Sequence, residues 1–261
     1  MSELRPVTLI TGASAGIGVE LARQFAQHGH ELVLVARREA ELAELARALE
    51  AETQARSHII VADLARSGAT AYVADEMRAR GLEPNFVVNN AGFGIVGPAA
   101  KLDRAEQLAI IDLNARALTD LSLRFIDHLA RHRGGILNVA SLAGFMPGPA
   151  FAVYTATKAY VVSFSEALHH ELKPNGIRVT ALCPGPVQTG FNARAGAPAE
   201  YFPAVLNRSA ERVARDGYNG LMAGRRVVVP GSANRIAAFL PRLVPRGLAL
   251  ALMSRSRKEV P

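Results

Sequence analysis

Short apolar runs alternate with longer amphipathic stretches along most of the chain. Between the short runs, apolar residues recur with helical spacing, as at Leu42, Leu45 and Leu49. The short runs have the length and composition of strands, and they predict strands over Val7–Thr11, Glu31–Ala36, Ser57–Ala62, Phe86–Asn89, Gly135–Ala140, Ile177–Cys183 and Arg226–Val229. The pattern is therefore one of strands that alternate with helices.

The longest amphipathic stretch lies between the fourth and fifth predicted strands. Asp103 and Glu106 have the spacing of a capping box, which predicts that a helix begins there. The apolar residues that follow predict a buried stripe of Leu108, Ile111, Ala115, Leu118, Phe125 and Leu129. Asn114 falls on the same face, where an amide without a hydrogen bond would cost a few kcal/mol, so we expect it to have a partner.

Strands this apolar, each followed by a helix, indicate a parallel sheet that is buried on both faces. The predicted fold class is α/β, a doubly wound seven-stranded parallel sheet in a single domain that comprises residues 1–261. In such sheets ligands bind at the carboxyl ends of the strands, so the residues that follow each strand are the candidates for function.

Composition supports a folded protein with a large core, since 49% of the residues are hydrophobic and 20% are charged. The single cysteine, Cys183, excludes an internal disulfide and is expected to be buried at a strand end. The apolar run Val7–Ile10 is too short for a signal-peptide core, so we expect no targeting segment and a cytoplasmic protein.

The net charge is +7, but basic residues are spread along most of the chain, and we expect no nucleic-acid partner. Five of the seven net charges lie after Pro230, where Glu259 is the one acid and the basic residues are Arg235, Arg242, Arg246, Arg255, Arg257 and Lys258. Residues 232–261 form a basic, apolar extension. It is expected either to lie on an anionic membrane surface or to pack against the core or a partner subunit, and no stretch is long enough to span a bilayer.

A glycine-rich turn follows the first strand and opens a helix. Glycine lets the backbone approach a pyrophosphate, and a helix N-terminus offers free N–H groups. The predicted pyrophosphate contacts are Gly12, Ser14, Ala15, Gly16, Ile17 and Gly18. Such a turn can also be a plain structural device, because its spacing differs from the common GxGxxG pattern.

Arg37 and Arg38 follow the second strand, at the place where an NAD enzyme would have an acid that bonds the ribose. A guanidinium fork matches phosphate oxygens, so the pair indicates the 2′-phosphate of NADP(H). The alternative is that both are solvated residues at the start of a surface helix. Asp63 and Leu64 follow the third strand and are expected beside the adenine.

Further polar and glycine residues follow the fourth and sixth strands. Asn90, Ala91 and Gly92 are expected to contact the cofactor, although asparagine is also a common turn residue. After the sixth strand, the Val187 N–H and the Thr189 hydroxyl are free to hold a carboxamide. Pro184 and Gly185 belong to the same predicted cofactor segment.

Ser141 ends the fifth strand, and Tyr154 and Lys158 follow at i and i+4 of a predicted helix, on one face. A lysine about 4 Å from the phenol would favour phenolate by about 4 kcal/mol at an effective dielectric of about 20, which is roughly three pK units. The tyrosine pKa would then fall from about 10 to near 7, where general acid–base catalysis is efficient. By itself the pair is equally typical of a surface helix.

Taken together, these motifs make residues 5 to 230 resemble the short-chain dehydrogenase/reductase superfamily. The motifs are Thr11–Gly18, Asn89–Gly92, Asn114, Ser141, Tyr154 with Lys158, and Pro184–Thr189. The resemblance implies a Rossmann fold and an NADP(H)-dependent oxidoreductase that interconverts a carbonyl and an alcohol. Ala15 departs from many NADP-preferring members, which have a basic residue there.

The resemblance also implies roles for four residues. Ser141 would orient the substrate oxygen, Tyr154 would transfer the proton, and Lys158 would bond the nicotinamide ribose while lowering the tyrosine pKa. Asn114 would support a water in the proton relay. A dimer or tetramer through the long fourth and fifth helices is a further implication, and a non-catalytic NADP(H)-binding sensor is the alternative function.

The substrate pocket is expected between the stretches that follow strands four, five and six. These are apolar, and the predicted substrate contacts are Ser141, Phe145, Tyr154 and Phe191. Residues 189–207, which include Tyr201 and Phe202, have little secondary-structure pattern and predict a mobile substrate lid. An apolar or lipid-like ketone or aldehyde is the expected substrate. The seven histidines lack the spacing of metal ligands, so no metal is expected.

Overall fold

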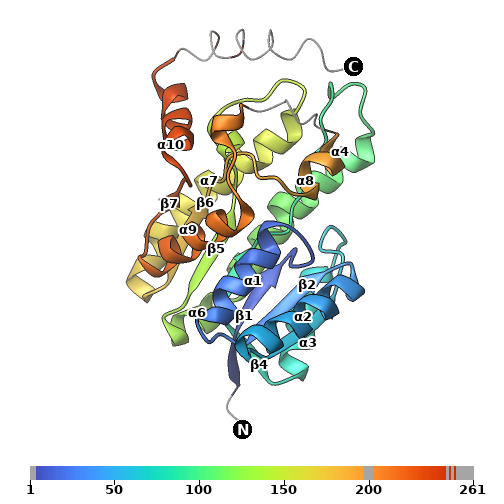
Figure 1. The fold of residues 1–261 in the computed structure, drawn as a ribbon, viewed down its shortest axis with the longest axis vertical. Helices are drawn as coiled ribbons and strands as arrows, with labels where there is room; N and C mark the ends of the chain where they lie inside the picture. The colour runs from blue at the N-terminus through green and yellow to red at the C-terminus, as the bar shows by residue number, and fades with distance from the viewer. Residues whose placement is uncertain (1–3, 197–202, 245–246, 248–249, 251–261) are drawn as a thin grey trace.

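The computed structural model describes residues 4–196, 203–244, 247 and 250. One parallel sheet runs through the molecule in the strand order β3-β2-β1-β4-β5-β6-β7 (Figure 1). The strands are β1 (Arg5–Thr11), β2 (Leu32–Ala36), β3 (Ser57–Val61), β4 (Leu82–Asn89), β5 (Gly135–Val139), β6 (Arg178–Leu182) and β7 (Val227–Val228). The order reverses between β1 and β4, which creates a crevice at the carboxyl ends of these strands.

Helices cover both faces of the sheet, so the predicted doubly wound α/β fold is confirmed (Figure 1). One face carries α1 (Ile17–Gln27), α2 (Glu39–Thr53) and α9 (Ala210–Met222). The other carries α3 (Ala69–Ala79), α5 (Leu118–Arg124), α6 (Ile126–His132) and α7 (Ala152–Leu172). The remaining α-helices are α4 (Arg104–Ile111), α8 (Gly190–Ala195) and α10 (Ser232–Phe239).

Every residue of β2 is buried, which explains why its sequence is apolar throughout. Leu32 and Leu34 pack in the core beneath α1, α2 and α9, whereas Val33 and Val35 pack beneath α3, α5 and α7. The two-residue period of a strand thus divides the core into two layers that share the sheet.

Strand β4 begins at Leu82, four residues before the predicted start at Phe86. Pro84 lies inside it, and proline is rare in a central strand because it cannot donate to the ladder. The register between β1 and β4 shifts at Val7/Thr8, next to this proline. The register shift between β1 and β4 therefore accommodates Pro84, a residue type that is unfavourable in a central strand.

The long helix expected after Asp103 is divided into α4, a π-helical turn over Asp112–Ala117, α5 and α6. Asp103 accepts a hydrogen bond from the Glu106 N–H, which confirms the predicted start. The predicted buried stripe is wrong at Leu108 and Ile111, which are exposed. A π-turn adds a residue to the helical period, so an apolar stripe that is continuous in the sequence is not continuous in space.

A chain of buried polar side chains joins the sheet to α5 and α7. Asn89 on β4 donates to Asn138 on β5 (2.9 Å) and to Ser122 on α5 (3.0 Å). Asn138 in turn donates to Ser165 on α7 (3.0 Å). The Nδ2 groups of both buried asparagines thus donate to partners on other elements, while Asn89 Oδ1 has no partner among the described residues.

The predicted lid, residues 189–207, has more regular structure than its sequence indicated. Gly190–Ala195 form α8, and Ala204–Leu206 form a 3-10 turn. The Ala195 carbonyl accepts from the Val96 N–H (2.8 Å), which ties α8 to the segment after β4. Tyr201 and Phe202 lie outside the described residues, as do most of the residues after Val244.

Candidate active site

A cavity of about 1000 Å³ lies at the carboxyl ends of the strands. It is lined by most of the residues predicted to bind a cofactor or substrate, namely Gly12, Ser14, Ala15, Gly16, Ile17, Arg37, Arg38, Asp63, Leu64, Asn90, Ala91, Gly92, Ser141, Tyr154, Lys158, Pro184, Gly185, Val187, Thr189 and Phe191. Gly18, Asn114 and Phe145 are not among the lining residues. Residues from six strand ends thus converge on one cleft.

The glycine-rich turn leaves space that a side chain would fill. Gly12 and Gly16 have φ angles of 65° and 57°, which favour glycine. A Cβ on Gly12 would lie 2.8 Å from Ala91 Cα, and one on Gly18 would lie 2.2 Å from the Gly12 carbonyl oxygen. Gly18 therefore serves the close packing of helix on strand, and the turn fits a dinucleotide pyrophosphate at the N-terminus of α1.

At the adenosine end, Arg38 reaches back to the glycine-rich turn. Its Nη2 donates to the Ser14 carbonyl oxygen (2.9 Å) and to Ser14 Oγ (3.1 Å), and its Nη1 pairs with Glu41 (3.1 Å). The Arg37 side chain has no ion pair or hydrogen bond within the described residues and lines the cavity. Asp63 accepts from the Ala65 N–H (3.2 Å) at the end of β3.

Helix α7 brings the predicted acid–base group to the cleft. Tyr154 and Lys158 are both buried and both line the cavity, with Ser141 opposite them at the end of β5. Burial raises the pKa of Tyr154 to about 12, and a hydrogen bond with Ser141 acts in the opposite direction. At neutral pH the phenol is therefore protonated and able to donate.

The predicted fall of the Tyr154 pKa to near 7 is not found, because burial outweighs the effect of the lysine charge. Lys158 Nζ donates to the Val139 carbonyl oxygen (2.7 Å) and lies 5.8 Å from the centroid of the Tyr154 ring. Burial lowers the pKa of Lys158 to about 8. Desolvation, which sequence spacing does not report, outweighs the charge interaction here.

Asn114 lies in the π-helical turn, fully buried behind the cleft. Its Oδ1 accepts from the Phe93 N–H (3.0 Å), and its Nδ2 donates to the Phe93 carbonyl (2.9 Å) and to Thr157 Oγ1 (3.1 Å). It has the partners that the sequence predicted for it. Asn114 thereby fixes the segment after β4 against α7.

The opposite wall is held by a residue that the sequence analysis missed. Asn234 on α10 is fully buried and donates to the carbonyls of Leu206 (3.1 Å) and Pro230 (2.7 Å). A Cβ on Gly185 would lie 2.6 Å from Asn234 Oδ1, so the amide packs directly on the cofactor segment. The signal in the sequence that could have identified Asn234 is an asparagine inside an apolar, basic extension.

Aromatic rings surround the phenol. Tyr154 stacks on Phe151 (centroids 4.3 Å apart) and lies 5.5 Å from Phe191 on α8. Phe145, a predicted substrate contact, instead packs against the core around Val161, and the neighbouring Met146 lines the cavity. The 3-10 turn over Leu142–Phe145 turns that ring away from the cleft.

Arg194 on α8 also lines the cavity and was not predicted. Its guanidinium lies 4.7 Å from the centroid of the Phe93 ring, as in a cation–π contact. Partial burial and then the charge of Arg37 lower the pKa of Arg194. The one basic residue in the predicted lid sequence was the signal that could have identified it.

Comparison with known proteins agrees with this geometry. The model of the short chain dehydrogenase family matches residues 6–199. Sulfoacetaldehyde reductase 2 of Chromohalobacter salexigens is 37% identical over 71% of this chain and 74% of its own length. For several other curated relatives the match spans only about half of the relative's length, for example 51% of a very-long-chain 3-oxoacyl-CoA reductase from Coprinopsis cinerea.

Two solved structures cover almost the whole chain. A short-chain dehydrogenase from Sphingobium yanoikuyae in complex with NADPH is 33% identical, covers 98% of both chains and has a TM-score of 0.81. The bulky-bulky ketone specific alcohol dehydrogenase from Comamonas testosteroni is 30% identical, covers 100% of this chain and 98% of its own, and has a TM-score of 0.76. The chain belongs to the short-chain dehydrogenase/reductase family. It is a nicotinamide-dependent oxidoreductase that acts on alcohol and carbonyl groups.

Two searches of the described residues complete the account of the site. Within them, no group of three or more His, Cys, Asp or Glu side chains is arranged to hold a metal ion. Nor is any helix in that part of the chain long and apolar enough to cross a bilayer.

Proposed function

We propose that the protein is an NADP(H)-dependent reductase of apolar, bulky or lipid-like ketones or aldehydes. The observation that carries the proposal is the single cleft that joins the Arg37 and Arg38 end to the Tyr154 end. The wall near Tyr154 is apolar, formed by Leu142, Met146, Phe151, Phe191 and Leu206. Such a wall favours a substrate that buries hydrocarbon.

In the proposed reaction a carbonyl oxygen lies between Ser141 and Tyr154. The Tyr154 phenol, protonated at neutral pH, donates its proton to that oxygen, while the Ser141 hydroxyl hydrogen-bonds to it and orients it. A bound reduced nicotinamide supplies the hydride that the carbonyl carbon receives. Lys158 holds a positive charge beside the phenol, which favours the phenolate that the transfer leaves behind. The reverse sequence oxidises an alcohol.

The Tyr154→Phe variant tests the role of the phenol. It keeps the ring that stacks on Phe151 and removes only the proton donor, so we expect normal NADPH binding by fluorescence and loss of nearly all turnover. Unchanged turnover would defeat the assignment. This variant also separates the enzyme from the alternative, a non-catalytic NADP(H) sensor, because a sensor would lose nothing.

A preference for NADP(H) is proposed from the two arginines. Arg38 is already held by Ser14, at the mouth of the adenosine end, and among the described residues Arg37 has no partner that would have to be displaced. Loss of a hydrogen bond to a charged group costs about 1.5–3 kcal/mol, so each of Arg37→Gln and Arg38→Gln should lower NADPH affinity roughly tenfold or more. NADH affinity should stay the same, and a parallel loss for both cofactors would contradict the preference.

The substrate class can be tested with ketones of increasing size. We expect kcat/KM with NADPH to rise as apolar substituents are added, because more hydrocarbon is buried against Phe151 and Phe191. Equal or better turnover of small polar ketones would remove this part of the proposal. We further propose that residues 189–207 act as the substrate lid, with Phe191 of α8 against the phenol.

Assembly and location are proposals of the same kind. Exposed Leu108, Ile111, Leu123 and Tyr160 on α4, α5 and α7 support a homodimer or homotetramer through these helices. Light scattering of Leu108→Asp against the wild type would test it, and an unchanged mass would contradict it. The exposed apolar side chains of α10 support a peripheral membrane contact of the C-terminal extension. A cytoplasmic location is consistent with one free, buried cysteine.

A further inference from the structure

A second cavity, of about 640 Å³, lies between α9 and the segment from β7 to α10. It shares no lining residue with the active-site cleft. Its charged lining consists of Arg208, Arg212, Asp216, Arg225 and Arg235. Four guanidinium groups and one carboxylate thus give this cavity, which we call the arginine cavity, a formal charge of +3.

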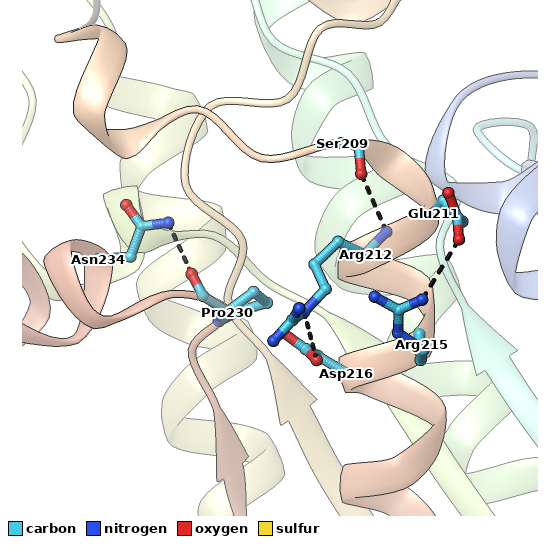
Figure 2. A network of polar contacts seen from close by, with 7 residues as sticks. All are labelled: Ser209, Glu211, Arg212, Arg215, Asp216, Pro230 and Asn234. Carbon is cyan, nitrogen blue, oxygen red and sulfur yellow. Dashed lines mark hydrogen bonds and ion pairs between the residues drawn. The ribbon is translucent and has the colours of Figure 1, made fainter.

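Most of this positive charge is not neutralised by the protein. Arg212 Nε pairs with Asp216 at 3.1 Å (Figure 2), and Asp216 is the one acid among the described residues that line the cavity. Arg208 donates to the uncharged carbonyls of Val205 (3.0 Å) and Asn207 (2.6 Å). Within the described residues, the guanidinium groups of Arg225 and Arg235 have no hydrogen bond or ion pair, and both residues are exposed.

The two arginines of α9, Arg212 and Arg215, both form ion pairs with acids of the same helix. Arg215, one turn from Glu211 on α9, forms an ion pair with it (3.3 Å) and does not line the cavity (Figure 2). Within the part of the chain that the structure describes, the unpaired charges of the cavity therefore come from Arg225 and Arg235 rather than from α9.

The backbone of the turn before α10 lies against one of these guanidinium groups. A Cβ on Gly231 would lie 2.4 Å from Arg208 Nε, so the guanidinium lies directly on the turn before α10. That turn precedes a helix N-terminus without a side-chain cap, which adds partial positive charge to the same place. Like charges that line one cavity repel one another, and an anion bound between them offsets that repulsion.

We propose that the arginine cavity binds a ligand that carries two or more phosphate groups. Arginine forks match phosphate oxygens in pairs, and the guanidiniums come from three different segments that surround one space. A charge of +3 favours a multiply charged anion over a single carboxylate. The phosphates come either from a soluble molecule or from lipid headgroups.

Inorganic pyrophosphate is the probe, titrated by calorimetry into the wild type and three double variants. Arg225→Gln with Arg235→Gln removes the two unpaired charges of the cavity. Arg47→Gln with Arg215→Gln makes the same change of net charge at exposed arginines elsewhere. Arg37→Gln with Arg38→Gln removes two of the three arginines that line the active-site cleft, where pyrophosphate could also bind. All six positions are exposed, so the variants should remain folded, which circular dichroism verifies.

We expect pyrophosphate to bind the wild type, and the affinity to fall at least tenfold in the cavity variant alone, since each charge-assisted bond is worth about 1.5–3 kcal/mol. Sedimentation with phosphatidylcholine vesicles, with and without phosphatidic acid, distinguishes the two sources. Vesicle binding that needs phosphatidic acid and is lost in the cavity variant assigns the phosphates to lipid. Equal pyrophosphate affinity in all four proteins, or no binding of either probe, would overturn the proposal.

Discussion

Replacement of Lys158 by methionine should stabilise the fold while it lowers turnover. The pKa of Lys158 falls from 10.5 to about 8 because the ammonium is buried. A shift of about 2.5 units corresponds to about 3 kcal/mol, by which the native protein disfavours the charged form relative to the unfolded chain. Methionine has a similar length and carries no charge, so this cost disappears.

One contact is lost in the exchange. Lys158 Nζ donates to the Val139 carbonyl, and a buried acceptor without its donor costs about 1 kcal/mol. The net expectation at pH 7 is that Lys158→Met unfolds with a free energy about 2 kcal/mol above that of the wild type. Lys101→Met, at an exposed lysine, is the matched control and should change the unfolding free energy little.

The pH dependence gives the sharper test. Below about pH 8 the lysine is charged in both states, so the cost is constant. Between about 8 and 10.5 the unfolded chain binds the proton and the native protein does not, so wild-type stability gains up to about 1.4 kcal/mol per pH unit from this group. Groups that both proteins share cancel in the difference. The advantage of Lys158→Met should therefore shrink as pH rises from 8 to 10.

Urea unfolding of both proteins at pH 7, 8, 9 and 10 measures this difference. If Lys158→Met were less stable than the wild type at pH 7, or if the gap between the two stayed constant up to pH 10, the buried ammonium would not carry the cost assigned to it. Turnover at pH 7 should be low in the same variant, because the charge that favours the Tyr154 phenolate is gone.

Three further results are expected. Gly18→Ala places a Cβ 2.2 Å from the Gly12 carbonyl oxygen and should destabilise the fold by about 1–3 kcal/mol in thermal unfolding, and an unchanged Tm would argue against the close packing. The rate of carbonyl reduction should fall as pH rises through about 8, where Lys158 loses its proton and Tyr154 is still protonated, whereas a profile that stays flat to pH 10 would contradict this. Asn114→Leu strands the backbone N–H and carbonyl of Phe93 and should cost about 1–3 kcal/mol in urea unfolding, with Asn114→Asp as the size-matched comparison.

The parts of the structure that could be predicted from the sequence are those with a strong local pattern. Apolar runs in the sequence predict all seven strands. The residues that follow the strands lie at one edge of the sheet, because parallel strands end together. The first half of β4 was not predicted because it contains Pro84. The strand accommodates this proline through a register shift against β1, which the local sequence does not indicate. The exposure of Leu108 and Ile111 was not predicted, because the one residue that the π-turn adds rotates the helix face.

The residues of the cleft and its wall that the sequence analysis missed reach their positions only through distant contacts. Arg194 is positioned by α8. The hydrogen bond between the Val96 N–H and the Ala195 carbonyl oxygen holds this helix near Phe93. Asn234 packs directly on Gly185, which lies nearly fifty residues earlier in the chain. Phe145 and Met146 are adjacent and similar in character, so only the turn geometry decides which of them faces the cleft.

The buried polar chain through Asn138 has a consequence for the positioning of the proton donor. Ser165 lies about three turns along α7 from Tyr154, on the same side of the helix. If α7 slid along its own axis by one turn, Ser165 would lose Asn138, and the Asn138 Nδ2 group would be left without this acceptor in the interior. The buried hydrogen bond between Asn138 and Ser165 thus fixes the position of the phenol relative to the end of β5. Apolar substitutions around α7 can then loosen the fold and still leave the reacting group in place, whereas a change at Ser165 should let the helix shift.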